Sequence, residues 1–222
     1  MLPEKTSIVV FDIDGTLTDS VRVHQTAFEA ALRGFGFPDL RTDWSSYRHH
    51  SDSAIFGEAW QEAGFAGSPD FGSLEDRFRA AFSRACRLDP IREIPGSSGL
   101  LAALTRSDWV PAFATGSLRS AAEYKLGVLT VPCDRDLLVT ASEYRTREEI
   151  VSAAIHRAAR KYGLSRDARV VSVGDGVWDL LTARTLGLEF IGVGRGAGAA
   201  VLRAHGAEVV PDLTMGAGLL AG

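Results

Sequence analysis

Apolar residues in the second half of the chain occur in short runs that alternate with longer amphipathic stretches. The runs at 109–114, 168–173 and 188–193 have the length of strands, whereas the apolar spacing over 97–105 and 147–162 is that of helices. The same pattern predicts short strands at 136–140 and 208–210 and helices at 117–126 and 179–186. Strands that alternate with helices in this way are typical of an α/β fold with a parallel, doubly wound sheet.

An earlier apolar run, at residues 8–11, ends abruptly at Asp12, Asp14 and Gly15. A short run rich in β-branched residues is typical of a buried strand, and open α/β sheets bind ligands at the carboxyl ends of their strands. Because residues two apart on a strand share a face, Asp12 and Asp14 are expected to point to one place at this edge. Two such carboxylates repel each other unless a cation or a shared proton intervenes, so the pattern indicates acid/base chemistry at a metal.

Residues 20–89 do not follow the alternating pattern. They show helical periodicity with Gly and Pro at the joints, over 23–32, 54–62 and 74–86. We interpret residues 20–89 as a helical cap inserted into a core that consists of residues 1–19 and 90–222. An insertion directly after the first strand would lie over the carboxyl end of that strand, where Asp12 and Asp14 are expected.

The composition is that of an ordinary globular protein. Of 222 residues, 45% are hydrophobic and 23% charged, with a net charge of −4, so neither nucleic acid nor a membrane is expected as a partner. Residues 1–7 are polar and do not resemble a signal peptide, and Cys86 and Cys133 have no metal-like or redox-like spacing. We therefore expect reduced thiols and a cytoplasmic location. No pattern in the chain indicates an oligomeric state.

Polar residues also follow two later strands. The Thr-Gly-Ser sequence at 115–117 offers hydroxyl and backbone N–H groups that suit an anion, although Ser and Thr equally well cap helices. Asp175 and Asp179 follow the strand at 168–173, and either carboxylate is as suitable for a helix cap as for a ligand.

Taken together, the predicted strand ends would bring Asp12, Asp14, Asp175 and Asp179 to one edge of the sheet. Each like-charged pair about 4 Å apart costs about 4 kcal/mol at an effective dielectric constant of 20, against a total stability of about 5–15 kcal/mol. A divalent cation removes this repulsion, and oxygen ligands with no His or Cys nearby favour Mg²⁺ over zinc.

These motifs, in this order, resemble the haloacid dehalogenase superfamily of phosphotransferases. The matching sequences are Asp-x-Asp-Gly-Thr at 12–16, Thr-Gly-Ser at 115–117 and Gly-Asp-x-x-x-Asp at 174–179, and the resemblance covers essentially the whole chain. It implies a Rossmann-like core with an inserted α-helical cap, as in phosphoglycolate phosphatases and β-phosphoglucomutases. It also implies Mg²⁺ and an aspartyl-phosphate intermediate.

The resemblance assigns roles to individual carboxylates. Asp12 would be the nucleophile, and Asp14 the general acid that protonates the leaving group and then the base that activates water. Mg²⁺ would be held by Asp12, Asp175 and the backbone carbonyl of Asp14, with Asp179 as a ligand or as a residue that orients one. An acid at position 14 favours phosphatases and phosphomutases over dehalogenases, because a halide leaves without a proton.

Phosphate oxygens would be bound by Thr115, by the N–H of Gly116, and by a lysine that the family usually has before its third motif. The lysines of this chain, none of them at a predicted strand end, are Lys5, Lys125 and Lys161. Arg145 or Arg147 stands where the lysine is expected. We favour Arg147, which falls in the first turn of a predicted helix, although either arginine could instead be solvated.

Some polar features have no assigned role. His49 and His50 lie in a polar segment of the predicted cap. Two interpretations are open: one histidine contacts the substrate, or both lie in a surface loop without a functional role. His24 is expected at an ordinary helix surface. The glycine-rich segment 194–198 lacks the full dinucleotide-binding pattern and is predicted to be a flexible loop.

The sequence therefore predicts a Mg²⁺-dependent phosphatase that acts on a small phosphorylated metabolite. A phosphomutase of the same family is an open alternative, and so is a non-catalytic binding module, because the fold alone does not confer activity. Phosphonate cleavage is less favoured, since it needs a Schiff-base lysine in the cap and no lysine lies between residues 6 and 124.

Overall fold

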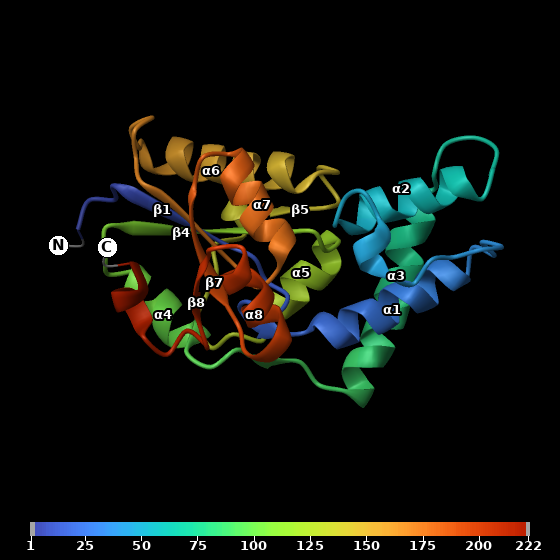
Figure 1. Cartoon of the computed structure of the whole chain (residues 1–222), viewed down its shortest axis with the longest axis horizontal. Helices are drawn as coiled ribbons and strands as arrows, with labels where there is room; N and C mark the ends of the chain where they lie inside the picture. Colours follow the sequence, from blue (N-terminus) through green and yellow to red (C-terminus); the bar gives the residue numbers. More distant parts are fainter. Residues whose placement is uncertain (1–2, 221–222) are drawn as a thin grey trace.

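The computed structural model describes residues 3–220, in which helices cover both faces of one parallel sheet (Figure 1). The sheet has six strands in the order β5-β4-β1-β6-β7-β8, and every pairing in it is parallel. These strands are β1 (Ser7–Phe11), β4 (Trp109–Thr115), β5 (Leu138–Thr140), β6 (Val170–Gly174), β7 (Glu189–Val193) and β8 (Glu208–Val210). The predicted α/β fold with a Rossmann-like sheet is thereby confirmed.

The central strand β1 is apolar on both faces, and this explains why helices pack on both sides of it. Ile8 and Val10 are buried in one apolar cluster with residues of α6, whereas Val9 and Phe11 are buried in another with residues of α4 and α5. The core helices are α4 (Ser97–Leu104), α5 (Arg119–Leu126), α6 (Arg147–Tyr162), α7 (Val177–Thr185) and α8 (Gly196–Ala204).

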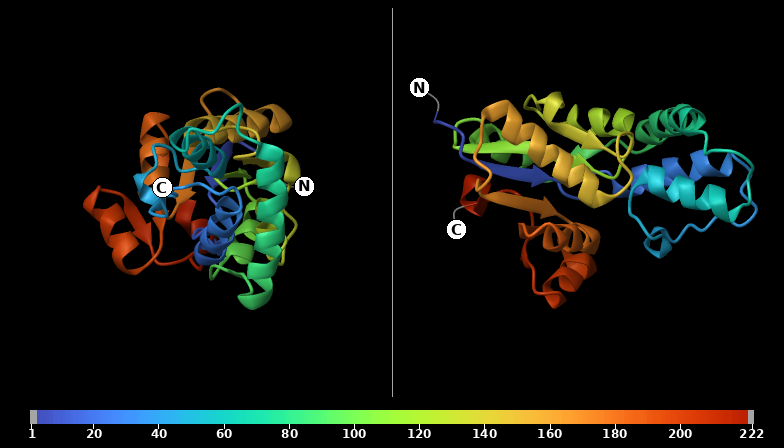
Figure 2. Two further views of the ribbon diagram at one scale, coloured as in Figure 1. Left: turned by 90° about the vertical axis from the view of Figure 1, so that its right-hand side faces the viewer. Right: turned by 90° about the horizontal axis from the view of Figure 1, so that it is seen from above.

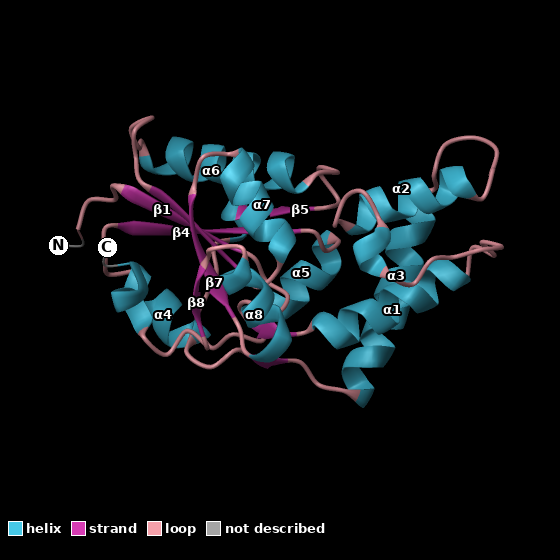
Figure 3. Ribbon diagram, viewed as in Figure 1, coloured by secondary structure: helices cyan, strands magenta, loops and turns pink. Residues whose placement is uncertain are grey.

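The cap lies beyond the carboxyl ends of β1 and β4, at the opposite end of the molecule from both termini (Figures 1 and 2). Figure 3 shows that this end is built from helices and loops, while the sheet occupies the other end. The cap helices are α1 (Val21–Arg33), α2 (Asp52–Glu62) and α3 (Phe71–Leu88), with a short 3₁₀ helix, η1 (Trp44–Ser46). Where the chain enters and leaves the cap, β2 (Thr18–Asp19) pairs antiparallel with β3 (Arg92–Glu93).

One apolar cluster holds the cap together and joins it to the core. Phe28, Phe56 and Phe78 are buried in the middle of the cap, and Leu118 and Ala121 at the start of α5 belong to the same cluster. The predicted division at residues 20 and 89 stays a prediction, and the ends of the predicted core, residues 1–2 and 221–222, lie outside the described residues.

Two expectations about local structure need correction. The segment 194–198 is only partly a loop, because α8 begins at Gly196, and the alanines that follow, including the buried Ala199, continue the helix. The strand predicted at 136–140 begins at Leu138, after the 3₁₀ helix η2 (Arg135–Leu137). A last 3₁₀ helix, η3, spans Gly216–Leu220. Within residues 3–220, every helix is too short or too polar to cross a membrane.

Removing a large side chain from the cap cluster should destabilise the protein strongly. Phe78 is fully buried on α3, so Phe78→Ala is expected to lower the free energy of unfolding by about 3–5 kcal/mol, as measured by urea denaturation. Leu88→Ala on the same helix is the matched control, because Leu88 is 83% exposed and its loss should cost less than about 0.5 kcal/mol. Equal losses for the two variants would contradict the buried position of Phe78.

Candidate active site

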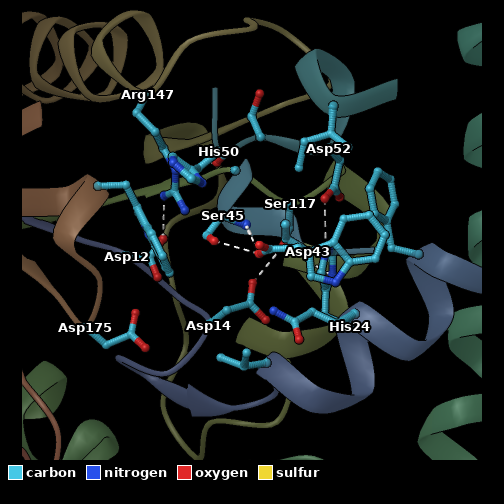
Figure 4. Close-up of a pocket in the computed structure, with 18 of the residues that line it drawn as sticks. Asp12, Asp14, His24, Asp43, Ser45, His50, Asp52, Ser117, Arg147 and Asp175 are labelled. Atoms are coloured by element: carbon cyan, nitrogen blue, oxygen red, sulfur yellow. Dashed lines mark hydrogen bonds and ion pairs between the residues drawn. The ribbon is translucent and has the colours of Figure 1, made fainter. Parts of the chain in front are cut away.

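Three neighbouring strands deliver polar residues to one edge of the sheet. Because β4, β1 and β6 are adjacent and parallel, Gly116, Asp12 and Asp175 follow strand ends that meet side by side. A cavity of about 410 Å³ lies between this edge and the cap (Figure 4). Asp12, Asp14, Asp175, Gly116, Ser117 and Arg147 line it from the core.

Gly15 permits the close approach of the two acidic strand ends. Its φ of +77° is in the left-handed region, and a Cβ at this position would lie 2.1 Å from Oδ2 of Asp175. The glycine of the first motif therefore serves two purposes, since it turns the chain after β1 and leaves space for a carboxylate of the third motif.

Asp12, Asp175 and Asp179 form a compact acidic cluster. Each offers a carboxylate oxygen, and these oxygens all lie within 4.8 Å of one another. Burial, followed by the charge of Asp179, raises the pKa of Asp12 to about 7. Burial likewise raises the pKa of Asp175 and of Asp179, and for Asp175 the charge of Asp12 adds to the effect. The raised pKa values show that the three carboxylates repel one another in this buried place, and a divalent cation would remove this repulsion.

Arg147 enters this cluster from the start of α6. A capping box between Thr146 and Glu149 begins the helix, which places Arg147 at its first position. Its Nη1 lies 2.8 Å from Oδ1 of Asp12 and 3.4 Å from Oδ1 of Asp179, and its Nε donates to the backbone carbonyl of His50 at 2.8 Å. Arg147 therefore contacts both the acidic cluster and the cap.

Arg145, the other arginine that the sequence offered, lies elsewhere. Its guanidinium stands 5.3 Å from the ring centre of Phe71, and its backbone carbonyl accepts a hydrogen bond from Ser51. The structure thus brings Arg147 to Asp12 and leaves Arg145 at the side of the cap.

Asp14 is not part of the acidic cluster, because its carboxylate is held by a different set of donors. Nζ of Lys125 lies 2.7 Å from both of its oxygens, and the hydroxyls of Ser20 and Ser117 donate to it at 2.5 and 2.6 Å. Burial alone would raise the pKa of Asp14, but the charges of Lys125 and His24, together with hydrogen bonds from Lys125 and Ser117, outweigh it and hold the pKa well below its usual value. Asp14 is therefore ionised at neutral pH.

Sequence reasoning missed Lys125, whose side chain is fully buried. Its ammonium also donates to the hydroxyl of Ser117 at 2.8 Å and to Nδ1 of His24 at 3.0 Å. The only local signal is that Lys125 follows the core-facing residues Ala121 and Ala122 by four and three positions, which puts it on the buried face of α5.

The expectation that His24 is an ordinary surface residue was wrong. Its side chain is only 12% exposed and lines the cavity, because α1 turns this face toward the site. Since Lys125 donates to Nδ1, Nε2 carries the hydrogen that Asp52 accepts at 2.9 Å. Asp52 also accepts from the backbone N–H of Leu118 at 2.9 Å, so the chain of contacts runs from the cap back to the core.

The Thr-Gly-Ser sequence is divided in the structure. Thr115 is buried, and its hydroxyl accepts a hydrogen bond from the N–H of Ser117 at 3.2 Å. It is not among the described residues that line the cavity. Gly116 does line the cavity, and a Cβ there would lie 2.5 Å from the carbonyl oxygen of His50. The glycine therefore allows the cap to approach the strand end.

A parallel sheet with carboxylates at the ends of adjacent strands and inserted helices above them defines a class of α/β enzymes that bind ligands at this edge. The model of the haloacid dehalogenase-like hydrolase family matches residues 6–187, and the chain belongs to this family. The family is the one that the three motifs of the chain resemble.

Solved structures share the same fold. A hydrolase from Pseudomonas syringae is 26% identical and superposes with a TM-score of 0.71 over 95% of both chains. CbbY from Rhodobacter sphaeroides, solved in complex with phosphate, is 17% identical with a TM-score of 0.72 over all of both chains, a likeness that shows the fold alone. The tyrosine-protein kinase PtkA of Mycobacterium tuberculosis is 28% identical over 203 residues, which are 89% of this chain. This chain spans 65% of the length of that kinase.

Removal of the buried lysine should destabilise the protein in a pH-dependent way. Lys125→Met is expected to lower the free energy of unfolding at pH 7 by about 3–5 kcal/mol, because Asp14 is left buried without its cation. The loss should shrink as the pH falls toward 4, since an unpaired Asp14 takes up a proton at a higher pH than the paired one. Urea denaturation at several pH values measures both effects.

Lys161→Met is the matched control for this variant. Lys161 forms ion pairs with Asp134 and Asp136 at the surface, so its loss should change the free energy of unfolding little at any pH. A loss at Lys125 no larger than at Lys161 would refute the buried ion pair.

Proposed function

We propose that this hydrolase is a Mg²⁺-dependent phosphatase that acts on a small phosphorylated metabolite through an aspartyl-phosphate intermediate. The observation that carries the proposal is Asp12 at the floor of the cavity, with one oxygen held by Arg147 and the carboxylates of Asp14 and Asp175 beside it. We also infer a cytoplasmic location, which agrees with the unpaired Cys86 and Cys133.

In the proposed reaction, an oxygen of Asp12 attacks the phosphorus atom and the bond between phosphorus and the ester oxygen breaks. Because Asp14 is ionised in the free enzyme, it first takes up a proton from solvent or from the monoanion of the substrate. It gives this proton to the departing alkoxide and then takes one from a water molecule, whose oxygen displaces Asp12 from phosphorus. The products are the free alcohol and inorganic phosphate. The ion pair with Lys125 favours the carboxylate form of Asp14, which is the form that activates water.

We propose that Arg147 and the N–H of Gly116 bind the phosphate oxygens. Both line the cavity next to Asp12, and a planar guanidinium can donate to Asp12 and to a phosphate at once. Thr115 stays a weaker candidate for this role, since its hydroxyl is already engaged by the N–H of Ser117.

The acidic cluster fits Mg²⁺. Its donors are all carboxylate oxygens within 4.8 Å of one another, and burial raises the pKa of each of them, so a cation would stabilise their charged forms. We propose that Asp12, Asp175 and the backbone carbonyl of Asp14 hold the ion, and that Asp179 is a ligand or orients one. When bound, Mg²⁺ supplies positive charge that offsets the charge on the transferred phosphoryl group.

Two of the similar proteins bear on the choice of reaction. The structure of CbbY was solved in complex with phosphate, which agrees with a substrate that carries a phosphoryl group. PtkA is named a kinase, and a kinase must bind the highly charged nucleoside triphosphate that supplies the phosphoryl group. Among the described residues that line the cavity, Arg147 is the one arginine or lysine that could offset this charge. We therefore propose hydrolysis and not transfer from a nucleotide.

Replacing the nucleophile tests the proposal. Asp12→Asn should lower kcat/KM for p-nitrophenyl phosphate with Mg²⁺ by at least about a thousandfold, because an amide cannot form the aspartyl-phosphate. Asp167→Asn, at an exposed position, should retain the activity of the wild type. With a sugar phosphate as substrate, release of inorganic phosphate in place of an isomerised ester separates a phosphatase from a phosphomutase. Equal activity of the wild type and Asp12→Asn would exclude the proposed mechanism.

Metal binding should depend on pH. We expect Mg²⁺ to raise the thermal unfolding midpoint, and to raise it more at pH 8 than at pH 6. The pKa of Asp12 is raised to about 7, so at pH 6 the ion must displace a proton that is already lost at pH 8. Thermal scans in MgCl₂, compared with NaCl of equal ionic strength, measure the shift.

Two variants control this measurement. Asp175→Asn should abolish the shift, because it removes one ligand of the acidic cluster, while Asp167→Asn should keep it. The same shift in Asp175→Asn as in the wild type would place the ion elsewhere.

A further inference from the structure

Aromatic and aliphatic side chains form much of the cavity wall above the carboxylates. Phe28 and Trp44 of the cap contact each other, with ring centres 5.5 Å apart. His50 stacks on Trp178, with ring centres 5.1 Å apart and planes inclined by 27°. All four rings line the cavity, and the aliphatic lining residues are Val21 and Ile55. This wall offers flat apolar faces to the organic part of a substrate.

The cap side of the cavity carries no arginine or lysine among its described lining residues. Burial and the nearby Arg147 lower the pKa of His50, so its ring is neutral at pH 7. The charged groups that the cap contributes are the carboxylates of Asp43 and Asp52. A second phosphate or a carboxylate on the substrate would meet like charge here and find no cation.

The carboxylates of the cap wall are already engaged. Asp52 accepts from His24 and from the backbone of Leu118, and Asp43 accepts from Ser45. Among the described residues that line the cavity, the neutral polar side chains without a hydrogen bond are Gln25, Thr42, Trp44, His50 and Trp178. They can bind a hydroxyl or an amide of the substrate, but they offer no positive charge to a second anionic group.

We propose that the substrates of this site are phosphate monoesters of an aromatic alcohol or phenol that carry no second anionic group. The rings of Phe28, Trp44 and Trp178 would contact the aromatic part while Asp12 and Arg147 face the phosphate. This proposal rests on the proposed phosphatase activity and narrows it, because it excludes sugar bisphosphates and phosphorylated carboxylic acids as preferred substrates.

Three esters of primary alcohols test the proposal by release of inorganic phosphate: benzyl phosphate, glycerol 3-phosphate and fructose 1,6-bisphosphate. Each leaves as an alkoxide, so benzyl phosphate has no large advantage from its leaving group. We expect kcat/KM for benzyl phosphate to exceed that for either of the others by about tenfold or more. Similar values for all three esters, or a preference for the bisphosphate, would overturn the proposal.

Trp44→Ala should lower the ratio of kcat/KM for benzyl phosphate to that for glycerol 3-phosphate by about tenfold, and Trp44→Phe should restore most of it. Tyr162→Ala, which removes an exposed ring from α6, is the matched control and should leave the ratio unchanged. An unchanged ratio in a folded Trp44→Ala variant would show that Trp44 does not contact the aromatic part of the substrate.

A second variant keeps the test valid if Trp44→Ala fails to fold. Val21 lines the cavity and is 36% exposed, so Val21→Lys can place a cation at the rim without disturbing the core. It should raise kcat/KM for fructose 1,6-bisphosphate relative to benzyl phosphate by at least about threefold. No change in this ratio would contradict the role assigned to the uncharged wall.

The outcomes also separate this proposal from the one on which it rests. Phosphate release from all three esters without preference would leave the phosphatase intact and refute the aromatic specificity. No release from any ester, nor from p-nitrophenyl phosphate, would refute the phosphatase. Binding of benzylphosphonate, followed by tryptophan fluorescence in the wild type and in Trp44→Ala, gives a readout that needs no turnover. Equal affinity in the two proteins would again count against the aromatic wall.

Discussion

The gathering of carboxylates at one edge of the sheet is the constraint on which the rest of the structure depends. Strands β1 and β6 are parallel neighbours, so the acidic residues after them cannot be spread apart. Two cations offset part of this charge, because the largely buried Arg147 contacts Asp12 and the fully buried Lys125 contacts Asp14. Asp175 forms no ion pair with the described residues, so the negative charge of its carboxylate is the one in this group that no protein cation offsets.

The same two cations also fix the cap over the site. Lys125 donates to His24 of α1, and Arg147 donates to the backbone carbonyl of His50, just before α2. Charge balance in the core and placement of the cap are therefore one network of contacts. A change at either cation would alter both the electrostatics of the carboxylates and the shape of the cavity above them, so the chemistry and the specificity of the site are coupled.

Local sequence patterns are sufficient for the sheet and for the residues at its edge. An apolar run that ends in a carboxylate predicts a strand with an acidic residue at its carboxyl end. Parallel pairing of such strands then brings these residues to one edge of the sheet. Lys125 and His24 are different, because Lys125 reaches Asp14 across 111 positions in the chain and no neighbouring residue indicates the contact. These groups meet only because α5 packs against α3 and the sheet while α1 packs against α3, and a local sequence pattern does not indicate packing of this kind.

An arginine at position 147, where the sequence resemblance led us to expect a lysine, suits the two contacts that this residue makes. Its Nη1 contacts Asp12 while its Nε donates to the carbonyl of His50, each at 2.8 Å. A lysine has a single nitrogen on a flexible stem, so a contact with Asp12 would leave the cap carbonyl without this donor. Because His50 in turn stacks on Trp178, the guanidinium that balances the charge of Asp12 also holds one wall of the cavity in place. The arginine at position 147 therefore affects the shape of the cavity in which the organic part of a substrate must fit.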